Sequence, residues 1–445
     1  MNGGDGTEPE ATAARAERSG GARAAWLAPT AVTAEERVAE EWAERFEAFL
    51  DALGSRFFTR SDLRRQALGY VRELLAGGPE GPGSALPPVL PPGGAAATGP
   101  DPSWLRQHLL GRAVWDPDPI RDFTTDYVVD GLADGTGGGV LVLDELSFRR
   151  KGTASAGVLH GHAEEFGGVV SRQIGVFAAW STTAGTAMVD RELYLPPAWD
   201  ADPERRRRAH VPPHVGPAGK GELAWRVVDR FRARLPEAAA RGMWVVADAR
   251  LTTEPTLARR LEDEGVPRVL AVAPDHPVLP QPGWRRIGRL VAGHARESEW
   301  DWLTVGSDAV DTAPWQWWVR RIPTLPRRAG APPPDPAAPE QARWLVACRR
   351  TGDVEARRHF LAHGPADTPL DELASVVATW RHGRNVLTGA VERTGLANYR
   401  VRSWHGWYRH VTLAQAAAAF LAVQTGGHPR GTVLSPLPPL LDTGR

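Results

Sequence analysis

Two short apolar runs, each ending in an aspartate, decide how this chain is expected to fold. The first is Gly139-Val140-Leu141-Val142-Leu143-Asp144, and the second is Met243-Trp244-Val245-Val246-Ala247-Asp248. Short apolar runs rich in valine predict buried strands, because a strand covered on both faces needs no alternation of polar residues. Ligands and metals bind at the carboxyl ends of strands in α/β sheets. Asp144 and Asp248 are therefore candidate site residues.

Further strands and helices are expected on both sides of these runs. Strand patterns occupy 173–179, 186–193, 269–272 and 345–348. Apolar residues at helical spacing mark 222–235, 256–264, 370–378 and 411–423. Alternating strands and helices predict an α/β fold, in which the strands at 173–179 and 186–193 form an early antiparallel meander.

Composition divides the chain into segments of different character. A capping box at Thr33 to Glu36 and the apolar spacing after it predict an N-terminal helical region. The expected segments are a disordered tail at 1–30, the helical region at 31–76, a Gly/Pro-rich linker at 77–100, a helical lead-in at 101–138, a core at 139–283 and 345–425, an inserted β-rich subdomain at 284–344 and a C-terminal tail at 426–445.

Charge and cysteine content limit the class of protein. The 53 basic side chains balance 53 acidic ones, so any DNA-binding face must be a local patch on a neutral body. The single cysteine, Cys348, excludes a disulfide framework and fits a reducing compartment. No apolar run reaches the length of a bilayer span, and Met1 to Arg23 lacks the apolar core of a secretion signal. We therefore expect a cytoplasmic protein.

Two basic stretches are candidates for contact with a nucleic acid backbone. The candidate DNA-binding residues of the second stretch are Arg400, Arg402, Arg409 and His410. They alternate with aromatic residues, which indicates either a phosphate-gripping surface with stacking platforms or a packed aromatic cluster. The first stretch, Arg205 to Arg208, is better explained as a solvated surface than as a phosphate grip.

A series of collinear segments spans most of the chain. They are Trp115-Asp116, Ile120-Arg121-Asp122, Val140 to Asp144, Lys151-Gly152, Ile174 to Phe177, Asp190 to Pro196, Val246 to Asp248, Leu257 to Gly265, Val269 to Val272, Tyr399 to Arg402 and Trp407 to Leu413. Through these segments the chain from Trp104 to Gln424 resembles an RNase H-like DDE transposase of the bacterial insertion-sequence type.

The resemblance implies a fold, an activity and its requirements. The fold would be a mixed RNase H-like sheet with flanking helices. The activity would be metal-dependent phosphodiester cleavage and strand transfer in DNA transposition and recombination. Asp144 and Asp248 would be the first two catalytic acids and ligands of Mg²⁺. The partner would be duplex DNA, at element ends, with a homodimer left open.

The chain departs from the family pattern at the third acid. The family carries a Glu on a helix shortly before the Tyr399 segment, and an ungapped alignment puts Arg384 there, or Gly383 after a shift of one residue. Glu392 is the nearest acid, about 12 Å further along a helix. Ala249-Arg250 also replaces an expected acid after Asp248. A cation in place of a ligand repels the metal, so the resemblance implies impaired catalysis.

Two hypotheses of different class follow. The first is a transposase-like DNA-binding protein whose phosphoryl-transfer chemistry is impaired. The alternative is a domesticated, non-catalytic DNA-binding regulator or partner protein on the same scaffold. A decaying element with no selected function would carry the same residues. The first hypothesis predicts that Asp144 and Asp248 lie on adjacent strands, with carboxylates within about 4–7 Å of each other.

Overall fold

The computed structural model describes residues 34–75, 102–135, 138–279, 285–294, 301–303, 315–323, 339–350 and 357–426. The tails expected at 1–30 and 426–445 lie outside these ranges almost entirely, as does the linker at 77–100, and Thr33 of the expected capping box is also outside them. None of the described helices is long and apolar enough to cross a membrane.

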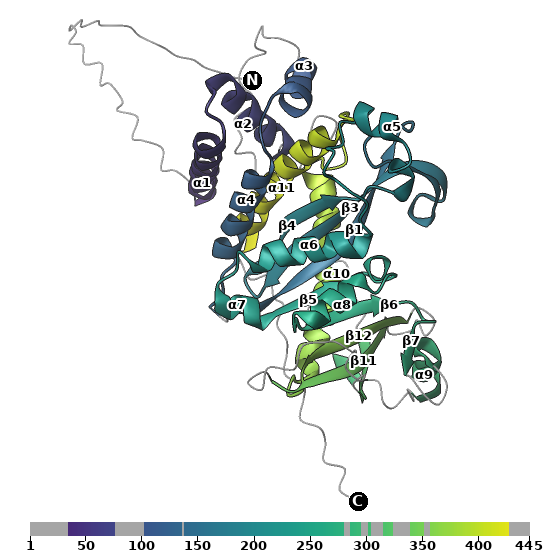
Figure 1. The fold of residues 1–445 in the computed structure, drawn as a ribbon. Helices are drawn as coiled ribbons and strands as arrows, with labels where there is room; N and C mark the ends of the chain where they lie inside the picture. The colour runs from purple at the N-terminus through teal and green to yellow at the C-terminus, as the bar shows by residue number, and fades with distance from the viewer. Residues whose placement is uncertain are drawn as a thin grey trace, which may run out of the picture.

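A ten-stranded mixed sheet forms the centre of the molecule (Figure 1). Its strands are β1 (Gly138–Arg150), β2 (Leu159–Ala163), β3 (Gly168–Thr182), β4 (Gly185–Leu193), β5 (Met243–Ala247), β6 (Arg268–Val272), β9 (Asp301–Leu303), β10 (Trp315–Ile322), β11 (Gln341–Arg350) and β12 (Arg358–Pro365). The order is β2-β3-β1-β5-β6-β12-β11-β10-β9, with β4 also beside β3. The pairs β1–β5 and β5–β6 are parallel and the other pairs are antiparallel. The expected α/β class with a mixed sheet is confirmed.

Helices cover both faces of this sheet. They are α1 (Ala34–Phe57), α2 (Ser61–Leu75), α3 (Pro102–Gln107), η1 (His108–Arg112), α4 (Asp118–Gly131), α5 (Pro203–Arg208), α6 (Lys220–Arg232), α7 (Glu237–Gly242), α8 (Thr256–Asp263), α9 (Ile287–His294), α10 (Leu370–Arg393) and α11 (Trp404–Gly426), with short 3-10 turns η2 (Glu164–Phe166), η3 (Pro197–Trp199) and η4 (Ala249–Leu251). A small separate sheet pairs β7 (Pro277–Leu279) with β8 (Arg285–Arg286).

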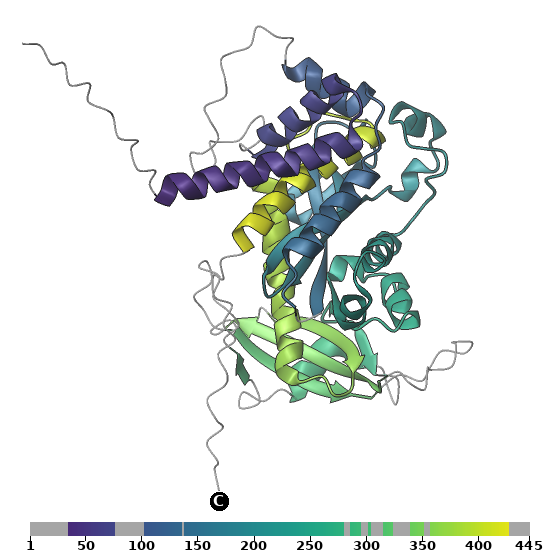
Figure 2. The ribbon, with the colours of Figure 1, turned by 90° about the vertical axis from the view of Figure 1, so that its left-hand side faces the viewer.

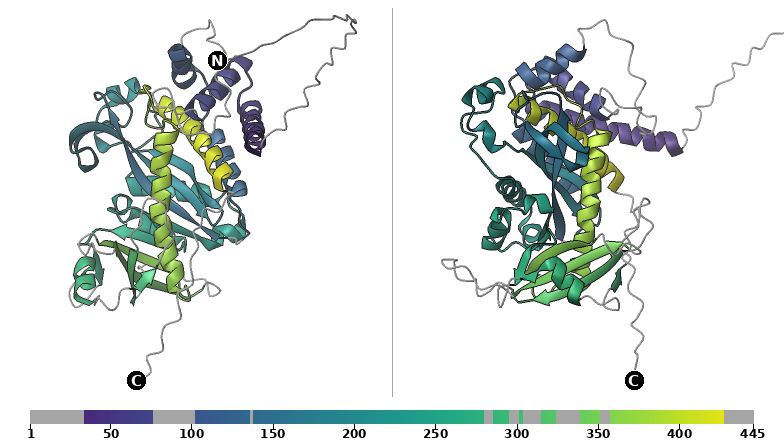
Figure 3. Two further views of the ribbon diagram at one scale, coloured as in Figure 1. Left: turned by 180° about the vertical axis from the view of Figure 1, so that it is seen from behind. Right: turned by 90° about the vertical axis from the view of Figure 1, so that its right-hand side faces the viewer.

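The alternation of side chains along β1 and β5 decides which helix each residue meets. Leu141 and Leu143 pack with α6 and α8 in one apolar cluster, whereas Val142 packs with α10 in another. Since successive side chains of a strand point to opposite faces, Asp144 shares the α10 face with Val142. Figure 3 shows α10 crossing this face of the sheet.

The N-terminal helices pack on the body through aromatic side chains. The rings of Trp42, Phe46 and Phe49 lie 4.9–5.5 Å from the ring of Phe420 in α11. Phe49 also contacts Tyr127 of α4. Figure 2 shows α1 and α2 on the side of the molecule where α11 and α4 lie.

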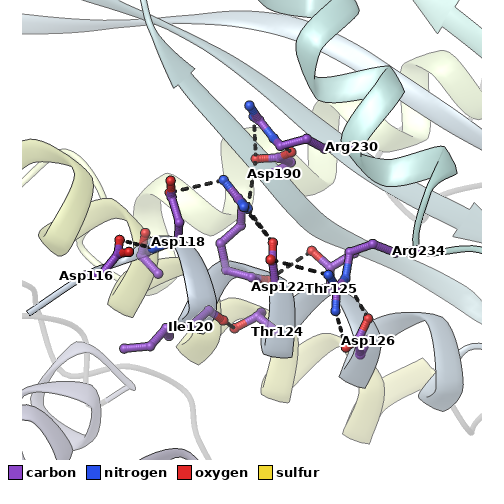
Figure 4. Close-up of polar contacts among 12 residues, drawn as sticks. Asp116, Asp118, Ile120, Asp122, Thr124, Thr125, Asp126, Asp190, Arg230 and Arg234 are labelled. Carbon is purple, nitrogen blue, oxygen red and sulfur yellow. Dashed lines mark hydrogen bonds and ion pairs between the residues drawn. The ribbon is translucent and has the colours of Figure 1, made fainter. Parts of the chain in front are cut away.

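A network of ion pairs around the buried Arg121 and Asp190 joins α4, β4 and α6 (Figure 4). Arg121 of α4 donates to Asp118 and Asp122 and lies 3.9 Å from Asp190 of β4. Arg230 of α6 donates to the same Asp190 at 3.1 Å. Two of the segments behind the family resemblance, 120–122 and 190–196, therefore meet in space and hold the helices against the sheet.

One expectation from the sequence is wrong. The first strand does not end at Asp144, because antiparallel pairing with β3 continues as far as Arg150 and Ser171. Only the parallel pairing with β5 stops there, at Leu143 and Ala247. In the described part of 284–344, the segment expected as a β-rich insertion, β9 and β10 extend the edge of the central sheet, because β10 pairs with β11 from Trp315 to Ile322.

Helix α10 is much longer than the 370–378 expected, and one glycine lets it lie close to β1. A Cβ on Gly383 would stand 2.7 Å from Cγ2 of Val142. Real Cβ atoms do not come so near, so a side chain at this position would push α10 away from the strand. By contrast, a Cβ on Gly389 would meet only the mobile end of Arg393.

We therefore predict opposite effects of two alanine substitutions in this helix. Gly383→Ala overpacks the contact with Val142 and lowers the free energy of unfolding by about 1–3 kcal/mol. Gly389→Ala, the matched control, is neutral or stabilises by up to about 1 kcal/mol through helix propensity. Urea denaturation measures both. Equal effects of the two substitutions would contradict the close approach of α10 to β1.

Candidate functional site

Asp144 and Asp248 lie side by side at the end of the parallel strand pair. Leu143 and Ala247 are the last parallel partners, and the backbone N–H of Asp248 donates to the carbonyl of Leu143 at 3.1 Å. Both carboxylates are buried. The two aspartates thus stand on adjacent strands, as the sequence predicted, and the next contacts show that their carboxylates are close.

Arg250 folds back over both aspartates. The 3-10 turn η4 starts directly after Asp248, whose Oδ1 accepts hydrogen bonds from the backbone N–H of Arg250 at 3.0 Å and from its Nε at 2.9 Å. The Nη2 of Arg250 donates to Oδ1 of Asp144 at 3.0 Å. One guanidinium therefore bridges the two carboxylates.

Arg384 bridges the same two carboxylates from the other side, from α10. Its Nε donates to Oδ2 of Asp144 at 2.6 Å, and its Nη1 lies 3.4 Å from Oδ2 of Asp248. The guanidinium also lies 4.9 Å from the ring centroid of Trp380, one helical turn earlier. Between the two positions considered for the third acid, Arg384 carries the side chain that reaches this centre, whereas Gly383 faces Val142.

Burial and the two arginines act against each other on the acids. Burial raises the pKa of Asp144, and the charge of Asp248 adds to this, although Arg384 and Arg250 oppose it. For Asp248, burial is outweighed by the charge and hydrogen bonds of Arg250 together with Arg384, so its pKa is lowered. Both carboxylates raise the pKa of Arg250 against the effect of its own burial, which keeps that side chain cationic.

This arrangement does not fit a divalent metal. Magnesium requires carboxylate and water oxygens in near-octahedral geometry. Here each of the four carboxylate oxygens of Asp144 and Asp248 faces a guanidinium. Two positive side chains already balance two negative ones, and no group of three metal-ligating residues occurs in the described parts of the chain. A metal would have to displace both arginines.

Neither of the other nearby acids completes the site. Glu145, the next residue along β1, points to the opposite face and pairs with Lys220 of α6 at 2.5 Å. Glu392 is exposed on α10, eight residues beyond Arg384 and about 12 Å further along the axis. The centre thus consists of two acids and two arginines. For Arg250, the only signal in the sequence was its position two residues after Asp248.

Two of the predicted DNA-binding residues are in the interior. Arg409 is buried and donates to the backbone carbonyls of Trp115 and Leu110. His410 is fully buried between the hydroxyl of Tyr70 and the carbonyl of Leu396, and burial lowers its pKa to about 4. The prediction that these two side chains grip phosphates is wrong, because their polar atoms hold the N-terminal helices and the α10–α11 connection in place.

The other two predicted residues remain candidates. Arg400 and Arg402 are exposed in the connection between α10 and α11. Trp404 and Trp407 are buried, so the aromatic residues of this stretch form the packed cluster that was the alternative to stacking platforms. Of the four predicted DNA-binding residues, only Arg400 and Arg402 are therefore at the surface.

Comparison with known families identifies the family of the chain. The family model described as DDE superfamily endonuclease matches residues 55–322, more than half of the chain. The chain belongs to the DDE superfamily endonucleases. Enzymes of this family act on DNA and use divalent metals. Asp144, Asp248 and Arg250 fall within the matched region, and Arg384 lies beyond it. A search of curated proteins finds no match to this endonuclease-like chain.

We predict that magnesium or manganese leaves the melting temperature of the wild-type protein unchanged. Replacing both cations, in Arg250→Ala/Arg384→Glu, opens the aspartates and supplies a third carboxylate. Metal at about a hundredfold above its Kd should then stabilise this variant by about 2.7 kcal/mol. Differential scanning calorimetry with and without metal measures the shift.

The matched control is Arg60→Ala/Arg241→Glu, which makes the same change of charge at two exposed ion pairs away from the centre. Metal should raise the melting temperature of this control no more than it raises that of the wild-type protein. A metal-induced rise in the melting temperature of the wild-type protein would show that the arginines yield to the metal.

Proposed function

We propose that this member of the DDE superfamily is a transposase-like protein that binds duplex DNA and has lost most of its phosphoryl-transfer activity. The observation that supports the proposal best is the pairing of Asp144 and Asp248 with Arg250 and Arg384. Element ends of an insertion sequence are the proposed DNA, and the cytoplasm is the proposed location.

The loss of activity follows from what a guanidinium cannot do. In the two-metal mechanism the ions activate a water and stabilise both the attacking and the leaving oxygen. An arginine can neutralise charge, but it cannot act as a base, because it does not lose its proton in proteins. Two arginines in place of metals would raise the barrier by several kcal/mol, about a thousandfold or more in rate.

A non-catalytic regulator or partner protein on the same scaffold is the second candidate. The burial of Arg409 and His410 favours it, because half of the predicted DNA-binding residues are inaccessible. The two candidates differ in whether the wild-type chain binds DNA at all.

For the wild-type protein we therefore expect weak, salt-sensitive binding to duplex DNA without cleavage in magnesium or manganese. Phosphate contacts dominate sequence-independent affinity, so the logarithm of the binding constant should fall linearly with the logarithm of salt concentration. Fluorescence anisotropy of a labelled duplex, followed by denaturing electrophoresis of the same samples, measures both. No binding at low salt would favour the partner protein, and cleavage abolished by Asp248→Ala would refute the loss of activity.

Back-substitution at Arg384 alone should not restore cleavage. In Arg384→Glu, Arg250 still bridges both aspartates. Only Arg250→Ala/Arg384→Glu frees all four carboxylate oxygens and provides three acids. Gly383→Glu serves as the register control and should destabilise the protein, because its side chain would meet Val142. Cleavage by Arg384→Glu alone would mean that Arg250 does not block the centre.

A further inference from the structure

Three segments far apart in sequence meet at one end of the molecule and carry exposed cations. Arg205 of α5 donates through Nη2 to the carbonyl of Thr153, in the connection between β1 and β2, at 3.0 Å. In the same connection, the N–H of Ala156 donates to the carbonyl of Arg402 at 2.8 Å. The N–H of Trp404 donates to the carbonyl of Ala209, just after α5, at 2.8 Å. These bonds link α5, the β1–β2 connection and the α10–α11 connection into one unit.

Some of the basic side chains in this unit serve to build it. Arg150 donates to the carbonyls of Tyr399 and Ala397, and its guanidinium lies 3.4 Å from the ring centroid of Tyr399. Arg206 pairs with Asp200 at 2.7 Å. Together with Arg205, these inward contacts fix the backbone from which the remaining cations project.

The remaining cations form a surface that we call the basic rim, defined as Lys151, Arg207, Arg208, Arg400 and Arg402. All five are exposed; the side chains of Arg207 and Arg208 are 71% and 76% accessible. The sequences 151–158 and 397–403 contain no acid, and the segment around α5 adds Asp200, Asp202 and Glu204. Glu204 pairs with both Arg207 and Arg208, so one acid is shared by two arginines. A chain of zero net charge therefore concentrates positive charge here.

We infer that the basic rim holds the backbone of duplex DNA. The inference rests on the proposed DNA binding and assigns it to a surface. Lysine and arginine contact phosphates without reading sequence, which fits flexible, exposed side chains on three short segments. The run at Arg205 to Arg208, interpreted from sequence as mainly solvated surface, thus supplies two inward anchors and two outward cations.

The position of the rim relative to the aspartates supports this assignment. Strand β1 carries Asp144 and ends at Arg150, directly before Lys151 of the rim, and Arg150 is six positions beyond Asp144. At about 3.3 Å per residue this is about 20 Å, or roughly six base pairs of duplex. A duplex held at the rim would therefore reach the centre of two acids and two arginines within less than one helical turn.

The test compares two triple variants in the full-length protein. Lys151→Ala/Arg207→Ala/Arg402→Ala removes three cations of the rim. Arg45→Ala/Arg60→Ala/Arg241→Ala removes three exposed, ion-paired arginines on α1, on the α1–α2 connection and on α7, and is the matched control. In Figure 1, α7 lies at the left edge of the molecule, away from α5 at the upper right. Circular dichroism melts of both variants establish that they fold.

The rim variant should bind a labelled duplex about tenfold or more weakly at about 0.1 M salt, with a salt slope smaller by about 2–3. The control should bind like the wild type. If the rim triple variant does not fold, the single charge reversals Arg208→Glu and Lys151→Glu replace it, with the same expected direction.

Equal affinities of the rim variant and the control would overturn the basic rim and leave the proposed DNA binding standing. Absence of DNA binding by the wild-type protein would overturn both. Binding that weakens in the rim variant but shows no dependence on salt would also overturn the inference, because phosphate contacts release counterions.

Discussion

The parallel pairing of β1 with β5, which stops at Leu143 and Ala247, is the constraint on which the rest of the centre depends. This register puts Asp144 and Asp248 next to each other on the face covered by α10. Helix α10 reaches that face closely because Gly383 has no side chain to meet Val142. Arg384, one residue later, is thereby brought within hydrogen-bond distance of Asp144. In this way the backbone geometry of a DDE endonuclease is kept, while an arginine takes a place beside the acids.

The four side chains of the centre depend on one another energetically. Two buried carboxylates on adjacent strands repel each other, and each needs a nearby positive charge to remain ionised. In the family that charge comes from divalent metals. Here Arg250 and Arg384 provide it from within the chain. Removing one member of such a buried group leaves an uncompensated charge, which typically costs about 3–5 kcal/mol. The centre is thus able to contribute to folding without a metal.

The sequence predicted the parts of this protein that local pattern determines. The apolar run from Met243 to Ala247 is β5 to the residue, and helical spacing located α6 and α8 within a few positions. The two aspartates were found because each follows such a run. Length was underestimated for β1 and α10, because their ends are decided by pairing with β3 and by packing on the sheet.

The residues that the sequence misjudged are those whose roles depend on contacts between distant segments. The second half of the expected DNA-binding surface was wrong, since Arg409 and His410 lie in the second turn of α11, a helix that is mostly buried. The apolar run from Ala416 to Phe420 was a signal of that burial. Arg250 was noted as a departure from the family, but its bridge to Asp144 depends on the turn η4 and could not be inferred from spacing.

The guanidiniums of Arg250 and Arg384 stand between Asp144 and Asp248, where a DDE endonuclease would hold its metals. The most direct measurement is anomalous scattering from crystals of the wild-type protein grown with manganese. We expect no anomalous peak between the two aspartates, and electron density there for the guanidiniums of Arg250 and Arg384. A manganese peak within about 2.3 Å of oxygens from both carboxylates, with either arginine turned away, would contradict it.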